Sequence, residues 1–195
     1  MVGAGGALVG ADAAVDAGAA FLVVPCRGMG TLAPFVRVEP ALASLLWIEH
    51  VSESPPADLA IGLLEDLRSA GKPIYAIKQG CVGGPGDRPG CFSIEVRLVE
   101  AVLAAAVAGS AAWERDPDFG YDVPGAVPGL ESDDARALLP RLLYADYDRV
   151  YEHASLVAAK KRERSALADS ISGLDPAIAD AAGWPPVAGS TDWRK

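Results

Sequence analysis

Two short apolar runs place the strongest constraint on how this chain can fold. Residues 19–25 (AAFLVVP) end at a proline, and residues 73–79 (PIYAIKQ) follow a helical pattern that ends at Gly71. Apolar runs of this length, bounded by Gly or Pro, are typical of buried strands. Between them leucines recur at helical spacing over residues 38–51 and again after Ser54. This order of elements predicts an α/β fold with a small mixed sheet flanked by helices.

Glycine and proline divide the rest of the chain. Residues 80–90 hold five glycines and two prolines, a composition that excludes a helix or a regular strand. Residues 26–35 (CRGMGTLAPF) are also predicted to be a loop. We expect a short strand at 91–94, a helix from Ile94 to Ala108, an extended Pro-rich segment at 110–130, and helices over 133–143, 144–169 and from Pro176 onward. The predicted organisation is a flexible lead-in at 1–18, a single α/β domain at 19–183 and an extended tail at 184–195.

Charge and cysteine content exclude several classes of function. The chain of 195 residues has a formal net charge of -9, which opposes binding to nucleic acid. Its three cysteines lack CxxC spacing, so we expect neither a disulfide framework nor a zinc site, and reduced thiols fit a cytoplasmic protein. Asp12 and Asp16 interrupt the apolar N-terminus, which fits neither a signal peptide nor a membrane span. The basic cluster at residues 160–164 is interpreted as a solvated helix face.

The segment from residue 74 to residue 130 carries a family resemblance. It contains IYAIKQGCVGGPGDRPGCFSIEVRLVEAVLAAAVAG and then DPDFGYDVPGAVPGL. These stretches resemble the C-terminal part of ATP-dependent phosphoenolpyruvate carboxykinases. The matching positions there are Gly80, Ser93, Ile94, Arg97, Phe119, Pro124, Pro128 and Gly129. Upstream, FLVVPCRGMGTLAPFVRVEP is similar through Gly30, Pro34 and Pro40. The resemblance implies a reduced domain of the carboxykinase C-terminal type over residues ~20 to ~160, a span consistent with one domain.

Departures from the family pattern argue against the family's activity. The phosphate loop, the metal-binding set and the oxaloacetate-binding arginine of that family would all precede the first residue here. The sequence holds no G-x-x-x-x-G-K-[ST] motif to surround phosphates with backbone N–H groups. The loop acid of the family corresponds to Arg27, its basic pair beside the base corresponds to Gly90 and Cys91, and its threonine corresponds to Val96. We therefore expect no nucleotide cofactor, no metal and no unaided kinase reaction.

The polar candidates cluster in the loops that follow the two predicted strands. The candidate catalytic residues are Arg27, His50, Lys78, Cys81 and Arg88. Backbone N–H groups of the glycine-rich loop could bind an anion together with Arg88, or the loop could be a simple connector. Cys81, near Lys78, could act as a nucleophile or be an ordinary small, half-buried residue, and Cys26 beside Arg27 presents the same choice. His50 ends a helix, where it could be a general base or a capping side chain.

Aromatic and acidic side chains complete the set of candidates. The candidate substrate-binding residues are Phe35, Trp47, Gly83, Gly84, Phe119 and Tyr121. The aromatic ones could line an apolar pocket, although such residues more often form core. Asp116, Asp118 and Asp122 could share a proton or bind a cation, but Asp-Pro and Asp-x-Gly sequences favour turn formation, which we prefer.

Three functions remain open at the level of sequence. The chain could be a small ATP-independent enzyme of secondary metabolism, performing cyclisation, isomerisation, lyase or decarboxylation chemistry on a small molecule. It could instead be a non-catalytic binding or regulatory module, or the C-terminal half of a split carboxykinase. A shortened domain would expose apolar surface, so we also expect a homodimer.

Overall fold

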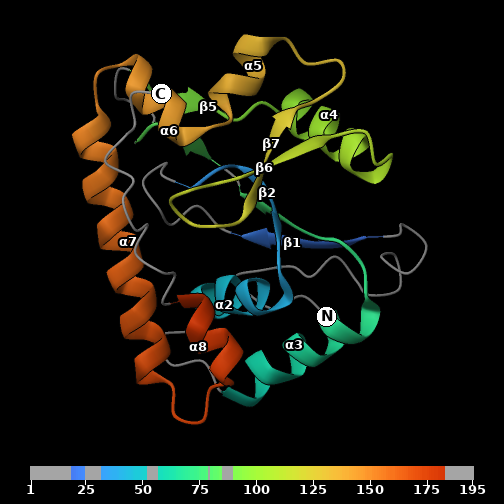
Figure 1. Cartoon of the computed structure of the whole chain (residues 1–195), viewed down its shortest axis with the longest axis vertical. Helices are drawn as coiled ribbons and strands as arrows, with labels where there is room; N and C mark the ends of the chain where they lie inside the picture. The colour runs from blue at the N-terminus through green and yellow to red at the C-terminus, as the bar shows by residue number, and fades with distance from the viewer. Residues whose placement is uncertain (1–18, 25–31, 52–56, 79, 85–89, 183–195) are drawn as a thin grey trace.

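The computed structural model describes residues 19–24, 32–51, 57–78, 80–84 and 90–182. Five described strands form one sheet in the order β1-β3-β2-β7-β6 (Figure 1). They are β1 (Ala20–Val24), β2 (Phe35–Val38), β3 (Ile74–Lys78), β6 (Ala112–Arg115) and β7 (Asp122–Ala126). β1 runs parallel to β3, whereas the pairs β2–β3, β2–β7 and β6–β7 are antiparallel. The expected mixed sheet is therefore confirmed.

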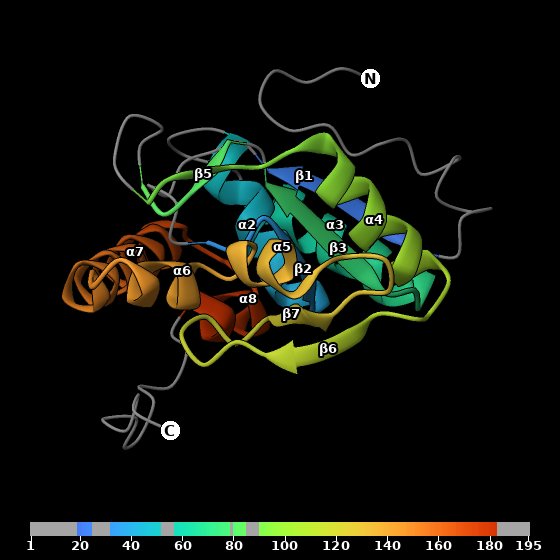
Figure 2. The same cartoon turned by 90° about the horizontal axis from the view of Figure 1, so that it is seen from above.

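Helices cover both faces of this sheet and create two cores. α2 (Pro40–Val51), α3 (Ala57–Ala70) and α8 (Pro176–Ala182) pack on one face, where the larger core also takes side chains from α7 (Val150–Ser170). α4 (Val96–Val107) covers the other face and packs on a smaller core around Phe35 and Tyr75. Figure 1 shows α4 on one side of β1 and α2, α3 and α8 on the other, and in Figure 2 α7 and α4 lie at opposite ends of the view. The layers confirm the predicted α/β class.

Short elements join the sheet to α7. β4 (Cys81–Val82) and β5 (Phe92–Ser93) form a two-stranded antiparallel hairpin. α5 (Ser132–Ala137) and α6 (Pro140–Asp146) follow β7 and lead into α7. No helix within the described ranges is both long and apolar enough to cross a membrane.

Most of the predicted elements are confirmed, and four details are corrected. β1, β3, α2, α3 and α4 lie where the pattern placed them, and Gly71 ends α3 with φ 59° as a left-handed cap. β2 lies at the end of a predicted loop and the start of a predicted helix, because four residues between two prolines give little periodic signal. β4 lies within the glycine-rich loop, and the extended segment 110–130 is a hairpin of β6 and β7. The last helical break falls at residues 147–149, where Asp148 has φ 54°, and not at Tyr144.

Candidate functional site

The two parallel strands end at the same edge of the sheet. Their register pairs Ala20 with Ile74 and Val24 with Lys78, so the loops that leave β1 and β3 start side by side. In open α/β sheets, ligands bind outside the carboxyl ends of parallel strands. This edge, which we call the carboxyl edge, is also where the sequence places most of the polar candidates.

Lys78 is the best-defined candidate at the carboxyl edge. The whole residue is 3% exposed, although it carries a charge at the last position of β3. Its Nζ donates to the carbonyl oxygens of Leu32 at 3.4 Å and Cys81 at 3.1 Å. The ammonium group therefore ties the segment before β2 to the hairpin after β3. A buried lysine is costly unless polar groups or negative charge surround it.

Phe119 and Tyr121 reach the same region from the turn between β6 and β7. Both are buried and their rings stack with centroids 5.7 Å apart. The Tyr121 hydroxyl oxygen accepts a hydrogen bond from the backbone N–H of Ala33 at 3.2 Å. Burial raises the pKa of Tyr121 well above its usual value, and the nearby Asp116 carboxylate acts in the same direction. Tyr121 is therefore a neutral hydrogen-bonding group at neutral pH.

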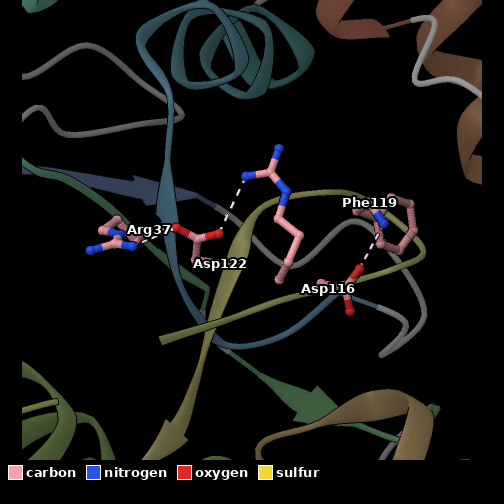
Figure 3. A network of polar contacts seen from close by, with 5 residues as sticks. Arg37, Asp116, Phe119 and Asp122 are labelled. Carbon is pink, nitrogen blue, oxygen red and sulfur yellow. Dashed lines mark hydrogen bonds and ion pairs between the residues drawn. The ribbon is translucent and has the colours of Figure 1, made fainter. Parts of the chain in front are cut away.

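Asp116 organises that turn. Its Oδ1 accepts hydrogen bonds from the backbone N–H groups of Asp118 at 3.0 Å and Phe119 at 2.6 Å (Figure 3). This pattern is the turn chemistry that the sequence favoured over a cation site. Burial is the main cause that raises the pKa of Asp116 to about 6, while the bond from the Phe119 N–H acts against it. Asp122 has a different role, because it bonds to Arg37 and so links β7 to β2 (Figure 3).

A buried ionic cluster on α7 escaped the sequence analysis. Lys160 and Arg164 lie one helical turn apart and point into the larger core, so their interpretation as a solvated face is wrong. Arg164 Nε lies 2.5 Å from Glu49 Oε1, and Lys160 Nζ lies 3.5 Å from Glu49 Oε2. The guanidinium of Arg164 also lies 5.2 Å from the centroid of the Phe119 ring. The i, i+4 spacing of the two cations was the sequence signal that both lie on one face of the helix. Their acidic partner, Glu49, is distant in sequence, so the pattern alone does not show that this face is buried.

A small, partly open cavity lies beside both this cluster and the carboxyl edge. Its volume is about 20 Å³, and Lys78, Tyr121 and Arg164 contribute to its wall together with aliphatic residues of β2, β3 and α2. Lys78, Phe119 and Tyr121 are thus three predicted site residues that the fold brings together. They come from β3 and from the turn before β7.

Other predicted site residues lie elsewhere. Phe35 stacks with Tyr75 and Trp113 in the smaller core, on the sheet face opposite Phe119. Trp47 is half-buried on α2 and packs against the larger core. His50 belongs to α2 by its backbone, and nothing is described of its side chain. Arg27 and Arg88 lie outside the described residues, as does Cys26.

The described end of the hairpin places Cys81, Gly83 and Gly84 close to α7. Cys81 is partly exposed, with its Sγ 4.0 Å from the Ser93 hydroxyl. Arg149 Nη1 donates to the Gly83 carbonyl at 2.7 Å, and its guanidinium lies 4.6 Å from the Tyr144 ring centroid. The Gly83 carbonyl therefore attaches the hairpin to the start of α7, whereas the Gly84 carbonyl accepts from Cys91 Sγ at 3.2 Å.

The surface also has a larger hollow of about 390 Å³ beside β7, α5 and α6. Its basic side chain, Arg136, is held by Asp146 through two hydrogen bonds. Because that charge is already paired, the hollow offers weaker recognition chemistry than the buried groups at the carboxyl edge.

Comparison with known proteins agrees with the resemblance noted in the sequence. No protein-family model matches the chain. A phosphoenolpyruvate carboxykinase (ATP) of Novosphingobium aromaticivorans is 33% identical over 93 residues, which cover 45% of this chain and 17% of that protein. The chain is distantly similar to ATP-dependent phosphoenolpyruvate carboxykinase. A second such carboxykinase, from Paracoccus denitrificans, is 25% identical over 157 residues, covering 64% of this chain and 28% of that protein. The similarity thus extends over part of this chain and less than a third of either carboxykinase.

Proposed function

We propose that this chain binds a small molecule at the carboxyl edge of the sheet. The observation that carries the proposal is Lys78, a lysine buried at the end of β3 beside a small cavity. Buried ionisable groups gather at functional sites. The position agrees with the general placement of ligands in open α/β sheets.

Binding without ATP is the form of this proposal that we prefer. Both carboxykinases carry ATP in their printed names, but this chain contains no G-x-x-x-x-G-K-[ST] motif. Lys78, Tyr121 and Arg164 are the polar residues that contribute to the wall of the cavity, and they are our candidates for orienting a small polar ligand at this edge.

A second candidate function, catalysis by a small ATP-independent enzyme, is favoured by Asp116. Its pKa of about 6 makes it able to give or take a proton near neutral pH. It lies in the same turn as Tyr121 and influences that hydroxyl electrostatically. Lyase, isomerase, cyclase and decarboxylase reactions can use such a group, together with a polar group that stabilises developing charge.

The binding proposal is tested by two-dimensional amide NMR of the full chain. Small carboxylates, neutral metabolites and ATP with magnesium are titrated separately. We expect a small molecule, and not ATP, to shift the amides of Lys78, Tyr121 and the β4–β5 hairpin. Lys78→Met should abolish those shifts, while Lys161→Met, the same change at a half-exposed lysine of α7, should leave them intact. Well-dispersed amide signals in the spectrum of Lys78→Met would show that this variant is folded.

The outcomes separate the candidate functions. If no compound shifts the amides at the carboxyl edge, the binding proposal is wrong. Micromolar binding of ATP with magnesium would favour one half of a split carboxykinase instead. Turnover of a bound compound, with a rate that changes near pH 6 and loses that inflection in Asp116→Asn, would favour the enzyme over the binding module.

A further inference from the structure

α4 is apolar on its outer side as well as on the side that faces the core. The inward residues belong to the smaller core, and they are Leu98, Val102, Ala105 and Ala106. On the outer side, Val96 is 72% exposed and Val107 is 53% exposed. A helix that is apolar all round is normally buried, so we expect the outer side of α4 to be covered in the native protein.

The outer apolar residues of α4 form one continuous line, which we call the α4 stripe: Val96, Val99, Leu103 and Val107. Spacings of three and four residues place them along one side of the helix. Val99 and Leu103 are partly buried, and they connect the two exposed valines at the ends. A continuous apolar surface of this kind differs from the single exposed apolar side chains that are normal on soluble proteins.

Charge does not oppose an approach between two such stripes. Arg97 and Glu100 are the charged residues of α4, and helical geometry places both of them on one side of the stripe, where they are exposed. Arg97 is held by Asp134 through two hydrogen bonds, at 2.7 and 3.2 Å. The stripe itself carries no charge, so a chain with a net charge of -9 meets its own copy here with little repulsion.

The other exposed large apolar side chains of the described residues do not form such a surface. Leu59 follows Asp58 in the first turn of α3. Tyr147 and Tyr151 are also exposed, but each ends in a hydroxyl group that water can satisfy. Among the described elements, α4 therefore has the strongest reason to bind another apolar surface.

We propose that the α4 stripe binds a second copy of this chain, with the two α4 helices packed antiparallel about a twofold axis. Such a contact uses the same patch on both copies, so the patch has to match itself. With the axis at the middle of the helix, Val96 of each copy lies opposite Val107 of the other, and apolar groups meet at both ends. Antiparallel packing also places the positive end of each helix dipole beside the negative end of the other. The stripe offers no charged or hydrogen-bonding side chain that would select a different protein, and its two ends are alike, which favours a copy of itself.

The size of the stripe limits the strength of this contact. α4 has 12 residues, so it is about 18 Å long. A stable dimer buries about 800 Å² on each partner, which is more than one helix of this length supplies. We therefore expect a weak dimer that dissociates on dilution. The stripe lies on the face of the sheet opposite the cavity beside Lys78, so this proposal does not depend on the proposed function.

Sedimentation velocity of the full chain over a wide range of concentrations tests the proposal. The mean mass should rise with concentration from 20.1 kDa toward twice that value. Val107→Asp places a charge within the apolar contact and should weaken the dimer by about tenfold or more. Leu59→Asp, the same kind of change at an exposed apolar residue of α3, should dimerise like the original protein. Circular dichroism checks that both variants, each changed at an exposed position, are folded.

Paired changes of charge test the antiparallel arrangement. Val96→Asp alone and Val107→Lys alone should each weaken the dimer, because each places a charge opposite an apolar group of the other copy. When both changes are made in one chain, opposite charges face each other across the axis at both ends of the contact. We therefore expect the double variant to dimerise more strongly than either single variant. In a parallel pair Val96 would lie opposite Val96, and no such recovery would occur.

Each outcome supports or overturns the contact. A monomer at every concentration overturns it, and so does equal dimerisation of Val107→Asp and Leu59→Asp, which would place the dimer contact elsewhere. A double variant that stays as weak as the single variants overturns the antiparallel arrangement. If the protein is monomeric and Leu8→Asp increases hydrogen exchange in the amides of α4, the segment that precedes β1 covers the stripe instead of a second copy. Ligand binding that persists in a monomeric Val107→Asp protein would leave the proposed function standing.

Discussion

Glu49→Gln should destabilise the fold more than other single changes of charge at described positions. The Glu49 side chain is 4% exposed and faces the buried Arg164 and Lys160. Glutamine keeps the shape but removes the charge, so that two buried cations lose their shared carboxylate. Breaking a buried pair from one side typically costs about 3–5 kcal/mol of the free energy of unfolding. For a chain of this size that corresponds to a fall of roughly 6–20 °C in the unfolding midpoint, at 2–4 °C for each kcal/mol.

Urea unfolding, followed by far-ultraviolet circular dichroism, measures the loss. The slope of free energy against urea should stay unchanged, because the same surface is exposed on unfolding. Glu163→Gln is the matched control: it contacts the same Lys160 but its side chain is 69% exposed, so we expect a change within about 1 kcal/mol. In a double variant, Glu49→Leu with Arg164→Leu should cost less than the two single changes together. If the free energy of unfolding of Glu49→Gln lies within about 1 kcal/mol of that of the original protein, the buried cluster is not a determinant of stability.

Three other predictions concern protons, backbone and assembly. Burial raises the pKa of Asp116 from 3.8 to about 6, so the folded state binds more protons than the unfolded state between these values. The free energy of unfolding should therefore fall by about 2 kcal/mol as pH rises from 4 to 6. Asp116→Asn should remove that fall in urea titrations across this range. Gly83→Ala should lower the free energy of unfolding by about 2 kcal/mol or more, because φ is +90° and the new Cβ would meet the carbonyl oxygen of Gly90. Gly62→Ala in α3, where the new Cβ meets nothing within 4 Å, should raise it by about 0.5–1 kcal/mol. Equal effects of the two variants would contradict this reasoning. The homodimer stays a prediction: light scattering should give twice the 20.1 kDa of one chain, and a monomer at all concentrations would reject it.

Local signals predicted the elements that form one continuous pattern. β1 and β3 are short apolar runs with Pro or Gly at their ends, and α3 combines an apolar face with a terminal glycine cap. Such elements are recognisable because their own residues specify both period and boundary. The mixed α/β class followed from these elements alone.

The parts that escaped prediction depend on partners distant in sequence. β2 has only four residues, and it becomes a strand because it pairs with β3 on one side and β7 on the other. Phe35 and Phe119 are both buried aromatics, but Phe35 of β2 packs in the smaller core, whereas Phe119, in the turn before β7, packs in the larger one. When the register of a strand is unknown, sequence periodicity does not tell which face of the sheet an aromatic side chain will occupy.

The α7 cations show why composition can mislead about a site. Lys160, Lys161, Arg162 and Arg164 form one basic run, and a basic run on a helix is most often solvated. Geometry divides the run, because residues four apart share a face, so that Lys160 and Arg164 turn inward while Arg162 stays exposed. What stabilises the inward pair is Glu49, from a helix formed more than a hundred residues earlier. One carboxylate shared by two buried cations leaves donors of Arg164 without an acceptor among the described residues. The two cations that enter the core are therefore among those that the charge pattern assigned to solvent.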